Sequence, residues 1–224
     1  MKVEFFEIDG LEYLIRYPEG FCTSERYPAV MYLHGAGNRG SKIESLAQDL
    51  FFLEFEKHDL PMLVVAPVCS ENTWFDMWER LEKLTEHISA LDFVDSDRLY
   101  LIGVSMGGYA TWQLSMSLPQ LFAAAVPICG GGMYWNAERL KNVPVWAFHG
   151  GLDIYVFPEE SRKMVDAVNA YGGEAKLTVY PDNGHDAWTD TFRNRQVFEW
   201  LLSQRREQVR DVVTSGFDNA EIFG

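Results

Sequence analysis

A serine flanked by glycines lies near the middle of the chain, in the segment Gly103–Gly108 (GVSMGG). The preceding run, 98–102, is apolar and of strand length, and the residues that follow, 109–116, are typical of a helix. A Gly-x-Ser-x-Gly sequence between a strand and a helix forms a tight turn that exposes the serine. The amides at the start of the helix then point toward a reacting oxygen. This context predicts that Ser105 is a nucleophile rather than an ordinary turn serine.

An acid and a base follow this serine, each behind a predicted strand. Residues 144–148 (PVWAF) have the pattern of a buried strand and lead to Asp153, and residues 175–180 (AKLTVY) alternate like a strand and lead to His185. Both side chains come just past a strand, at the edge where open α/β sheets bind ligands. The order Ser, Asp, His predicts that Ser105 attacks, that His185 takes and returns the proton, and that Asp153 orients the imidazole.

Two other aspartates close to His185 are alternative acids. Asp182 and Asp186 both lie in the same short segment as the histidine. A side chain so near in sequence does not readily reach around the imidazole to its far nitrogen. We therefore prefer Asp153 as the acid.

A glycine-rich loop upstream is suited to stabilising a negatively charged intermediate. Residues 27–33 (YPAVMYL) read as a strand and lead into residues 34–40 (HGAGNRG). A loop in this place supplies one amide of an oxyanion hole, and the residue after the nucleophile supplies the other. We assign these amides to Ala36 and Met106, with Gly37 as the alternative donor in the loop.

The remaining histidines and Cys129 are expected to have no catalytic role. His34 and His149 each precede a glycine at a strand end, where a hydrogen bond that braces the loop is favoured over catalysis. His58 and His87 are interpreted as helix-surface residues without a role. Cys129 lies in an apolar strand and is expected to be an inert core thiol.

The elements that position these residues form an α/β pattern. Asp9-Gly10 is a turn signal between two apolar runs, 3–8 and 11–17, and predicts an antiparallel hairpin. From residue 27 onward, predicted strands alternate with predicted helices, which favours a mostly parallel central sheet with helices on both faces. A further strand is expected over 62–68, and helices are expected over 43–53, 76–91, 161–171 and 191–208.

The segment 130–142, behind the sixth strand, is too short to form a separate cap domain. We therefore expect an open site with a minimal lid, in which Gly37, Trp135 and Trp188 are candidates for the pocket wall. One domain is expected to span residues 1–224. The tail, 212–224, is expected to be frayed or to pack against another subunit of a homo-oligomer.

Composition restricts the partners. The chain has 19 Lys and Arg against 33 Asp and Glu, a formal net charge of −14, which disfavours nucleic acid and anionic membranes. Its three cysteines are dispersed and show neither a disulfide framework nor a metal-ligand spacing. Acidic residues interrupt the apolar run at the N-terminus, so we do not expect it to act as a secretory signal, and no run approaches transmembrane length. We expect a cytoplasmic protein with reduced thiols and without cofactor or metal.

Four landmarks together resemble the α/β-hydrolase superfamily, in its small esterase branch. They are LHGAG at 33–37, GVSMGG at 103–108, HGGLD at 149–153 and GHDAW at 184–188. That branch includes dienelactone hydrolases, and the segment 122–132 is similar to the sixth-strand region of bacterial predicted peptidases and carboxylesterases. Dienelactone hydrolases use a cysteine nucleophile where this chain has Ser105, so the resemblance does not imply a dienelactone substrate.

The resemblance implies the α/β-hydrolase fold and a cofactor-free serine hydrolase. It would cleave a small-molecule or carbohydrate-linked carboxylic ester, with a short or aromatic acyl group, through an acyl-enzyme. A peptidase or thioesterase with the same triad is the close alternative, because the pocket and not the triad reads the leaving group. A non-catalytic binding protein is the alternative of another class. Such proteins usually lose a catalytic element, whereas the nucleophile, acid, base and oxyanion loop are all present here.

Overall fold

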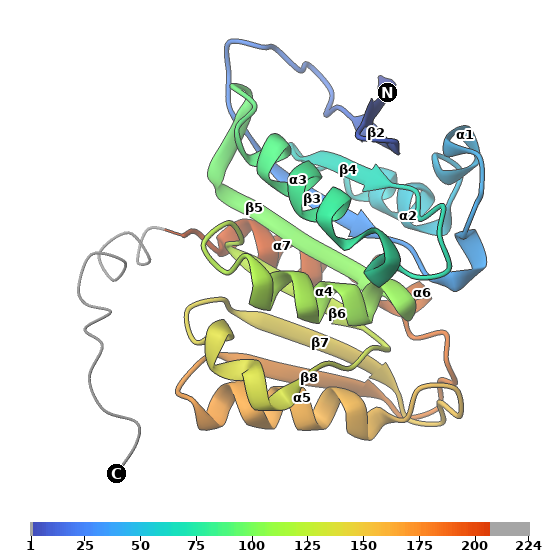
Figure 1. The fold of residues 1–224 in the computed structure, drawn as a ribbon, viewed down its shortest axis with the longest axis vertical. Coiled ribbons are helices and arrows are strands. Elements are labelled where there is room, and N and C mark those ends of the chain that lie inside the picture. Colours follow the sequence, from blue (N-terminus) through green and yellow to red (C-terminus); the bar gives the residue numbers. More distant parts are fainter. Residues whose placement is uncertain (1, 207–224) are drawn as a thin grey trace.

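The computed structural model describes residues 2–206, which form one twisted sheet covered by helices (Figure 1). The strand order is β1-β2-β4-β3-β5-β6-β7-β8; β2 is antiparallel to both β1 and β4, and all other neighbours are parallel. The expected α/β fold with a mostly parallel sheet is confirmed. The strands are β1 (Val3–Ile8), β2 (Leu11–Arg16), β3 (Tyr27–Leu33), β4 (Leu63–Pro67), β5 (Val94–Val104), β6 (Ala124–Ile128), β7 (Val145–Gly150) and β8 (Ala175–Tyr180).

Helices cover both faces of the sheet, because its central strands β3, β4 and β6 are buried along their whole length and need an apolar cover on each side. The helices α3, α4 and α5 pack on one face, and α1, α2, α6 and α7 pack on the other. Their bounds are α1 (Ile43–Leu46), α2 (Leu50–His58), α3 (Trp78–Ser89), α4 (Met106–Ser117), α5 (Pro158–Ala170), α6 (Trp188–Arg193) and α7 (Arg195–Ser203), with 3₁₀ turns η1 (Ala36–Asn38), η2 (Trp74–Met77) and η3 (Tyr134–Leu140).

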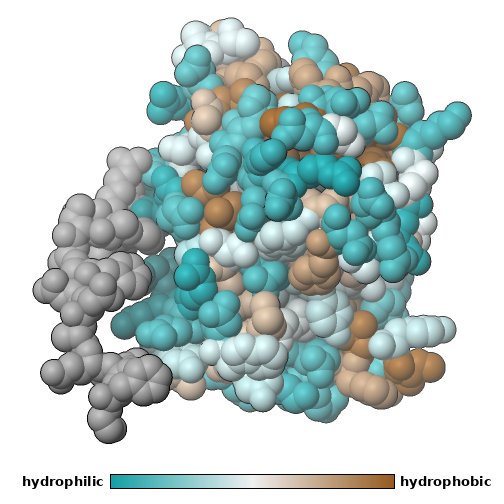
Figure 2. Space-filling model, viewed as in Figure 1, coloured by the Kyte–Doolittle hydropathy of each residue, from teal (hydrophilic) through white to brown (hydrophobic). Residues whose placement is uncertain are grey.

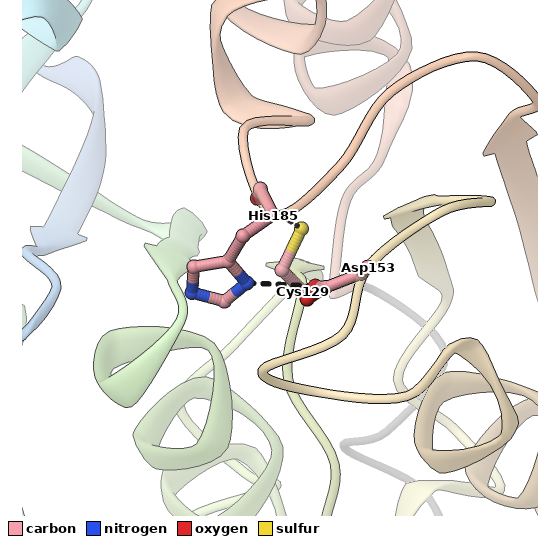
Figure 3. Close-up of side chains that lie close together, drawn as sticks. All are labelled: Cys129, Asp153 and His185. Atoms are coloured by element: carbon pink, nitrogen blue, oxygen red, sulfur yellow. Dashed lines mark hydrogen bonds and ion pairs between the residues drawn. The ribbon is translucent and has the colours of Figure 1, made fainter.

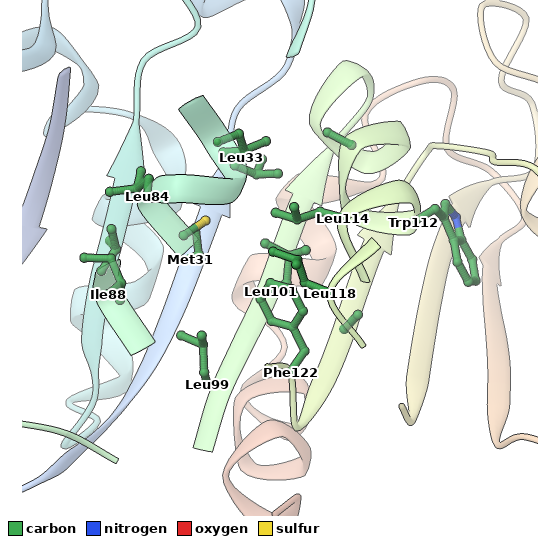
Figure 4. Close-up of a cluster of buried hydrophobic side chains, with 14 of the residues drawn as sticks. Met31, Leu33, Leu84, Ile88, Leu99, Leu101, Trp112, Leu114, Leu118 and Phe122 are labelled. Carbon is green, nitrogen blue, oxygen red and sulfur yellow. The ribbon is translucent and has the colours of Figure 1, made fainter. Parts of the chain in front are cut away.

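The core on the α3 and α4 side joins the central strands to those helices (Figure 4). Leu99 and Leu101 of β5 pack with Leu84 of α3 and Leu114 of α4, and all four side chains are fully buried. Burial of a leucine of this kind stabilises the fold by about 1.5–3 kcal/mol. The packing of α3 and α4 therefore holds β5, the strand that leads to Ser105, in place.

The parallel register brings the ends of the strands to one edge. Leu33 of β3 is paired with Gly103 of β5, and Gly150 of β7 is paired with Tyr180 of β8. The loops that carry residues 34–40, Ser105, Asp153 and His185 consequently leave the sheet side by side. This is the edge at which open α/β sheets bind ligands.

The predicted N-terminal hairpin is present. β1 and β2 pair from Ile8 with Leu11 outward, around Asp9 and Gly10. Both turn residues have positive φ, 50° and 76°, as a two-residue hairpin turn of the favoured type requires. The hairpin extends the parallel sheet through the β2–β4 pair.

Several predicted helices have different bounds. The segment 43–53 contains two helices, because Asp49 caps α2 by accepting a hydrogen bond from Phe51 N at 2.8 Å. The segment 76–91 begins with the turn η2, whose capping box is formed by Thr73 and Asp76. The segment 191–208 is divided at Asn194, which caps α7. In each case a capping side chain, which hydrophobic periodicity does not register, sets the boundary.

The expected short lid is a single 3₁₀ turn. Residues 130–142 contain only η3, which packs on α5 and α4. The predicted behaviour of the tail, 212–224, concerns residues outside the described range. Among the described residues, we find no helix with the length and apolar character needed to cross a bilayer.

The prediction that His58 is a surface residue is wrong. His58 ends α2 and is buried, and its Nε2 is 2.7 Å from the carbonyl oxygen of Phe192 in α6. Arg195 in addition donates to the His58 carbonyl oxygen at 2.8 Å. The helix α2 packs against α6, so a position that would face solvent on an isolated helix is covered. His87 is exposed, as expected.

Candidate active site

Ser105 sits on a sharp turn between β5 and α4. Its φ is +52° and its ψ is −115°, a conformation that a non-glycine residue rarely adopts. The Ser105 amide donates to Ile128 O at 2.8 Å and so ties the turn to β6. The turn also needs its glycines, because a Cβ at Gly107 would lie 2.0 Å from Leu33 O and one at Gly103 would lie 2.3 Å from Gly107 O.

His185 lies between Ser105 and Asp153 and contacts both. Its Nε2 is 2.8 Å from Ser105 Oγ, and its Nδ1 is 2.7 Å from Asp153 Oδ2. A carboxylate only accepts, so Nδ1 carries the hydrogen and Nε2 is left to accept from the serine hydroxyl. The structure thus brings the three predicted residues together, across separations of 80 and 32 residues in sequence, in one hydrogen-bonded chain.

The Asp153 carboxylate is held in its charged form. The residue is buried, and burial alone would raise its pKa. The hydrogen bond from His185 and those from the amides of Val156 and Tyr155, at 3.0 and 2.9 Å on Oδ1, outweigh burial and lower the pKa below its ordinary value. A buried charge fixed by these three donors can orient the imidazole and stabilise its protonated form.

The alternative acids lie elsewhere. Asp186 lies just before α6 and accepts from the amide and the hydroxyl of Thr189, at 3.0 and 2.9 Å. Asp182 is exposed. Neither makes the contact to the imidazole that Asp153 makes.

The two amides predicted for the oxyanion hole begin helical turns. Ala36 is the first residue of η1, and Met106 is the first residue of α4. The N–H of a first helical residue has no acceptor inside its own helix and is free to meet a ligand. Ala36 and Gly37 both line the cavity that contains Ser105 and His185.

His34 fixes the loop that carries these amides. The Cys69 amide donates to His34 Nε2 at 3.0 Å, so Nδ1 carries the hydrogen and donates to Gly35 O at 2.7 Å. Burial lowers the pKa of His34, which favours this neutral form. His34 therefore holds the loop in place, as a structural histidine would.

His149 has a similar position beneath the Asp153 loop. It is fully buried, with Nδ1 2.7 Å from Ser161 Oγ and Nε2 2.9 Å from Val156 O. Nε2 also lies 3.3 Å from Asp153 Oδ2, a contact that the sequence did not predict. Burial lowers the pKa of His149. These contacts agree with the structural role expected for His149. They hold in place the loop that carries Asp153.

Cys129 lies beside Asp153 and His185, directly after β6 (Figure 3). Its thiol donates to His185 O at 3.1 Å, and its φ is +48°. Burial raises the pKa of Cys129 to about 12, so the group is a thiol at neutral pH and is unreactive. These properties agree with the inert thiol that the sequence predicts. The sequence did not predict the contact of this thiol with the loop that carries His185.

Among the described residues, Cys129, Asp153 and His185 form a group whose side-chain atoms could bind a metal ion. The possible ligand atoms of the three residues lie within 4.8 Å of one another. Sequence spacing did not reveal the group because each residue comes from a different strand end. Its donor chemistry suits a metal poorly, since the thiol holds its proton and the carboxylate and imidazole are already bonded to each other.

A cavity of about 310 Å³ opens next to Ser105 and His185. Sequence reasoning included Gly37 and Trp188 in its wall, and both line it. It did not assign the other six residues of the wall to the site: Tyr32, Gly35, Asn38, Asp49, Leu50 and Val104. The complete lining is Tyr32, Gly35, Ala36, Gly37, Asn38, Asp49, Leu50, Val104, Ser105, His185 and Trp188.

Aromatic rings flank the imidazole. The rings of Trp188 and His185 meet edge to face, with their centroids 5.3 Å apart. The centroid of the Tyr155 ring lies 5.6 Å from that of His185. Tyr155 belongs to the loop after β7, where large apolar residues are exposed: Leu152, Ile154 and Phe157. Figure 2 shows hydrophobic side chains gathered over this loop, at the lower right of a largely hydrophilic face.

The prediction that Trp135 lines the pocket is wrong. Trp135 is 66% exposed, packs against Tyr134 and is not part of the cavity wall. The turn η3 that carries it packs on α5 and α4 rather than over Ser105. A lid too short to cover the site is also too short to bring its tryptophan there.

The fold and the hydrogen-bonded chain define the molecule as an α/β-hydrolase. A mostly parallel sheet, a serine on a strained strand–helix turn, and an acid and a histidine at later strand ends are the features of that class. The chain belongs to the dienelactone hydrolase family, whose family model matches residues 65–209.

Among curated relatives, dipeptidyl-peptidase 5 of Porphyromonas gingivalis is 22% identical over 241 residues, covering 82% of this chain and 34% of that protein. A protein of Escherichia coli O157:H7 that bears the name carboxymethylenebutenolidase is 29% identical over 160 residues, covering 63% of this chain and 56% of the other. The chain thus spans about a third and just over half of these relatives.

A solved structure of a thermostable esterase is similar over most of this chain. It superposes with a TM-score of 0.73 at 29% identity, covering 91% of this chain and 63% of the esterase. The family and this neighbour together support a hydrolase.

Proposed function

We propose that the protein is a serine carboxylesterase that cleaves esters of short or aromatic acids through an acyl-enzyme. The observation that carries the proposal is the chain Ser105 Oγ–His185–Asp153, with contacts of 2.8 and 2.7 Å. The chain order and the hydrogen bonds of these residues support the proposed roles of nucleophile, base and orienting acid in a serine triad.

The proposed reaction uses these groups in sequence. Ser105 Oγ attacks the ester carbonyl carbon while its proton passes to His185 Nε2, and the amides of Met106 and Ala36 stabilise the oxyanion. The tetrahedral intermediate collapses as His185 returns the proton to the leaving alcohol oxygen, which leaves an acyl group on Ser105. Water, deprotonated by His185, then attacks the acyl carbon and releases the acid.

The same machinery suits other acyl compounds, and a peptidase or thioesterase remains the alternative. The name dipeptidyl-peptidase 5 of one relative favours a peptide bond, and the esterase neighbour favours an ester. We favour the ester because the neighbour covers nearly all of this chain at the higher identity. The name of the other relative refers to a carboxylate-bearing lactone, which is also an ester.

The cavity sets an expectation for acyl length. At about 310 Å³ it is at the small end of ligand pockets, and no residue of η3 is among the described residues of its wall. A long acyl chain would stay largely in water and gain little from binding. We therefore propose a short or aromatic acyl group on a small or carbohydrate-linked alcohol.

Para-nitrophenyl esters test this proposal. We expect kcat/KM for the acetate or butyrate to exceed that for the palmitate by about tenfold or more, a difference of about 1.4 kcal/mol. Initial rates should be measured below the micelle-forming concentration of the palmitate. A palmitate that is cleaved faster by a clear margin would overturn the short-acyl proposal, and absence of hydrolysis of every ester would overturn the esterase proposal itself.

A further inference from the structure

The cavity beside Ser105 contains a carboxylate that the proposed mechanism does not use. Asp49 stands at the start of α2, and its side chain lines the same cavity as Ser105 and His185. It is only half-buried, so it remains accessible from that cavity. The reaction steps require no second acid at this place.

The hydrogen bonds of Asp49 are those of an ionised carboxylate. Oδ1 accepts from the Tyr32 hydroxyl at 3.1 Å and from the Phe51 amide at 2.8 Å, and Oδ2 accepts from Asn38 Nδ2 at 2.5 Å. All three partners donate, and a charged carboxylate has about four acceptor positions. One position, on Oδ2, is therefore left for a ligand.

Tyr32 is fixed as a donor in this group. Burial in the core, and next the Asp49 charge, raise the pKa of Tyr32 well above its ordinary value. The tyrosine stacks on Phe51 with a ring separation of 4.2 Å, which holds its hydroxyl toward Asp49. The carboxylate is consequently well positioned, not a mobile surface group.

No cation balances this charge within the cavity, since neither Lys nor Arg is among the described residues of its wall. Arg39 belongs to the loop that also carries Ala36 and Asn38, and it donates to Ala36 O at 3.1 Å and to Asn72 O and Oδ1 at 2.8 and 2.9 Å. These bonds direct its guanidinium to the Asn72 segment. The formal charge of −14 on the whole chain adds to the negative potential.

Helix capping does not explain the charge. Asp49 caps α2 through Oδ1, and asparagine caps a helix about as well as aspartate. A neutral side chain of the same shape would therefore do that work. The charge itself faces the cavity.

We propose that Asp49 determines the charge selectivity of the site. It favours esters that carry a cationic group and disfavours esters that carry a carboxylate, because the first gains and the second loses electrostatic free energy beside the unbalanced charge. The inference rests on the proposed esterase activity. Under this proposal, cationic esters are the preferred substrates and neutral esters come second.

Two matched ester series test the proposal. The first contains para-nitrophenyl caproate, aminocaproate and monoadipate, whose acyl groups end in methyl, ammonium and carboxylate. The second compares acetylcholine with its uncharged carbon isostere, dimethylbutyl acetate. We expect the wild-type enzyme to favour the cationic over the anionic or neutral ester by about tenfold in kcat/KM in at least one series, about 1.4 kcal/mol.

Variants assign this preference to one residue. Asp49→Asn should reduce the preference to within about threefold, whereas Glu44→Gln, which removes an exposed charge from the neighbouring helix α1, should leave it as it is. Added salt should weaken the preference of the wild-type enzyme for cationic esters, because salt screens a charge that reaches solvent.

The outcomes separate the two proposals. Esters cleaved without charge preference, or a preference that survives in Asp49→Asn, would overturn the role of Asp49 and leave the esterase proposal standing. Failure to cleave any ester of either series would overturn both. A preference that persists unchanged at high salt would also contradict the electrostatic origin.

Discussion

Ser105→Ala is expected to lower kcat by about 10⁴-fold or more, because the members of a serine triad act as a unit. Alanine removes the oxygen that is 2.8 Å from His185 Nε2 and therefore removes the proposed nucleophile. The residual rate would come from water attack assisted by the amides of Ala36 and Met106. Steady-state hydrolysis of para-nitrophenyl butyrate provides the measurement.

A matched control is available on the same helix. Ser115 is buried on α4, and its hydroxyl has no hydrogen-bond partner in the described part of the chain. Ser115→Ala should therefore keep kcat within about twofold and keep the fold, since no hydrogen bond is lost. If Ser105→Ala kept more than about a hundredth of the wild-type rate, Ser105 would not be the nucleophile.

Asp153→Asn is expected to reduce kcat by about 10⁴-fold without changing the shape of the site. The carboxylate fixes the imidazole tautomer by accepting from His185 Nδ1 at 2.7 Å, and it stabilises the imidazolium that forms during attack. An amide can do the first only in one orientation and cannot do the second. The Asp153 charge is present at neutral pH because its hydrogen bonds lower its pKa.

Asp182→Asn is the control for that variant. Asp182 lies close to His185 in sequence, yet it is exposed and does not make the contact to the imidazole that Asp153 makes. Its replacement should change kcat by less than about twofold, as surface substitutions usually do. A larger loss in Asp182→Asn than in Asp153→Asn would reverse the assignment of the acid.

The three residues of the triad geometry could be predicted because each has a local signature. Ser105 lies between glycines at a strand–helix boundary, and Asp153 and His185 each follow a recognisable strand. Parallel pairing brings all strand ends to one edge, so local signals were enough to place distant residues together.

The cavity wall could not be predicted in the same way. Tyr32, Asn38 and Asp49 meet because β3, η1 and α2 converge, and no periodic pattern in the sequence encodes that meeting. Asp49 carried a signal only as a helix cap, which the expected single helix over 43–53 concealed. The predictions for Trp135 and His58 were wrong for a related reason, because tertiary packing alone decides which face of a short element is covered.

Labelling with a fluorophosphonate, followed by intact mass and peptide mapping, is the most direct test of the claim that this chain is a serine hydrolase. The reagent phosphonylates a serine only where a base and an oxyanion hole activate it. We expect one adduct on the folded protein, mapped to Ser105, and none after Ser105→Ala. An adduct on another serine, or no adduct on the folded wild-type protein, would contradict the account.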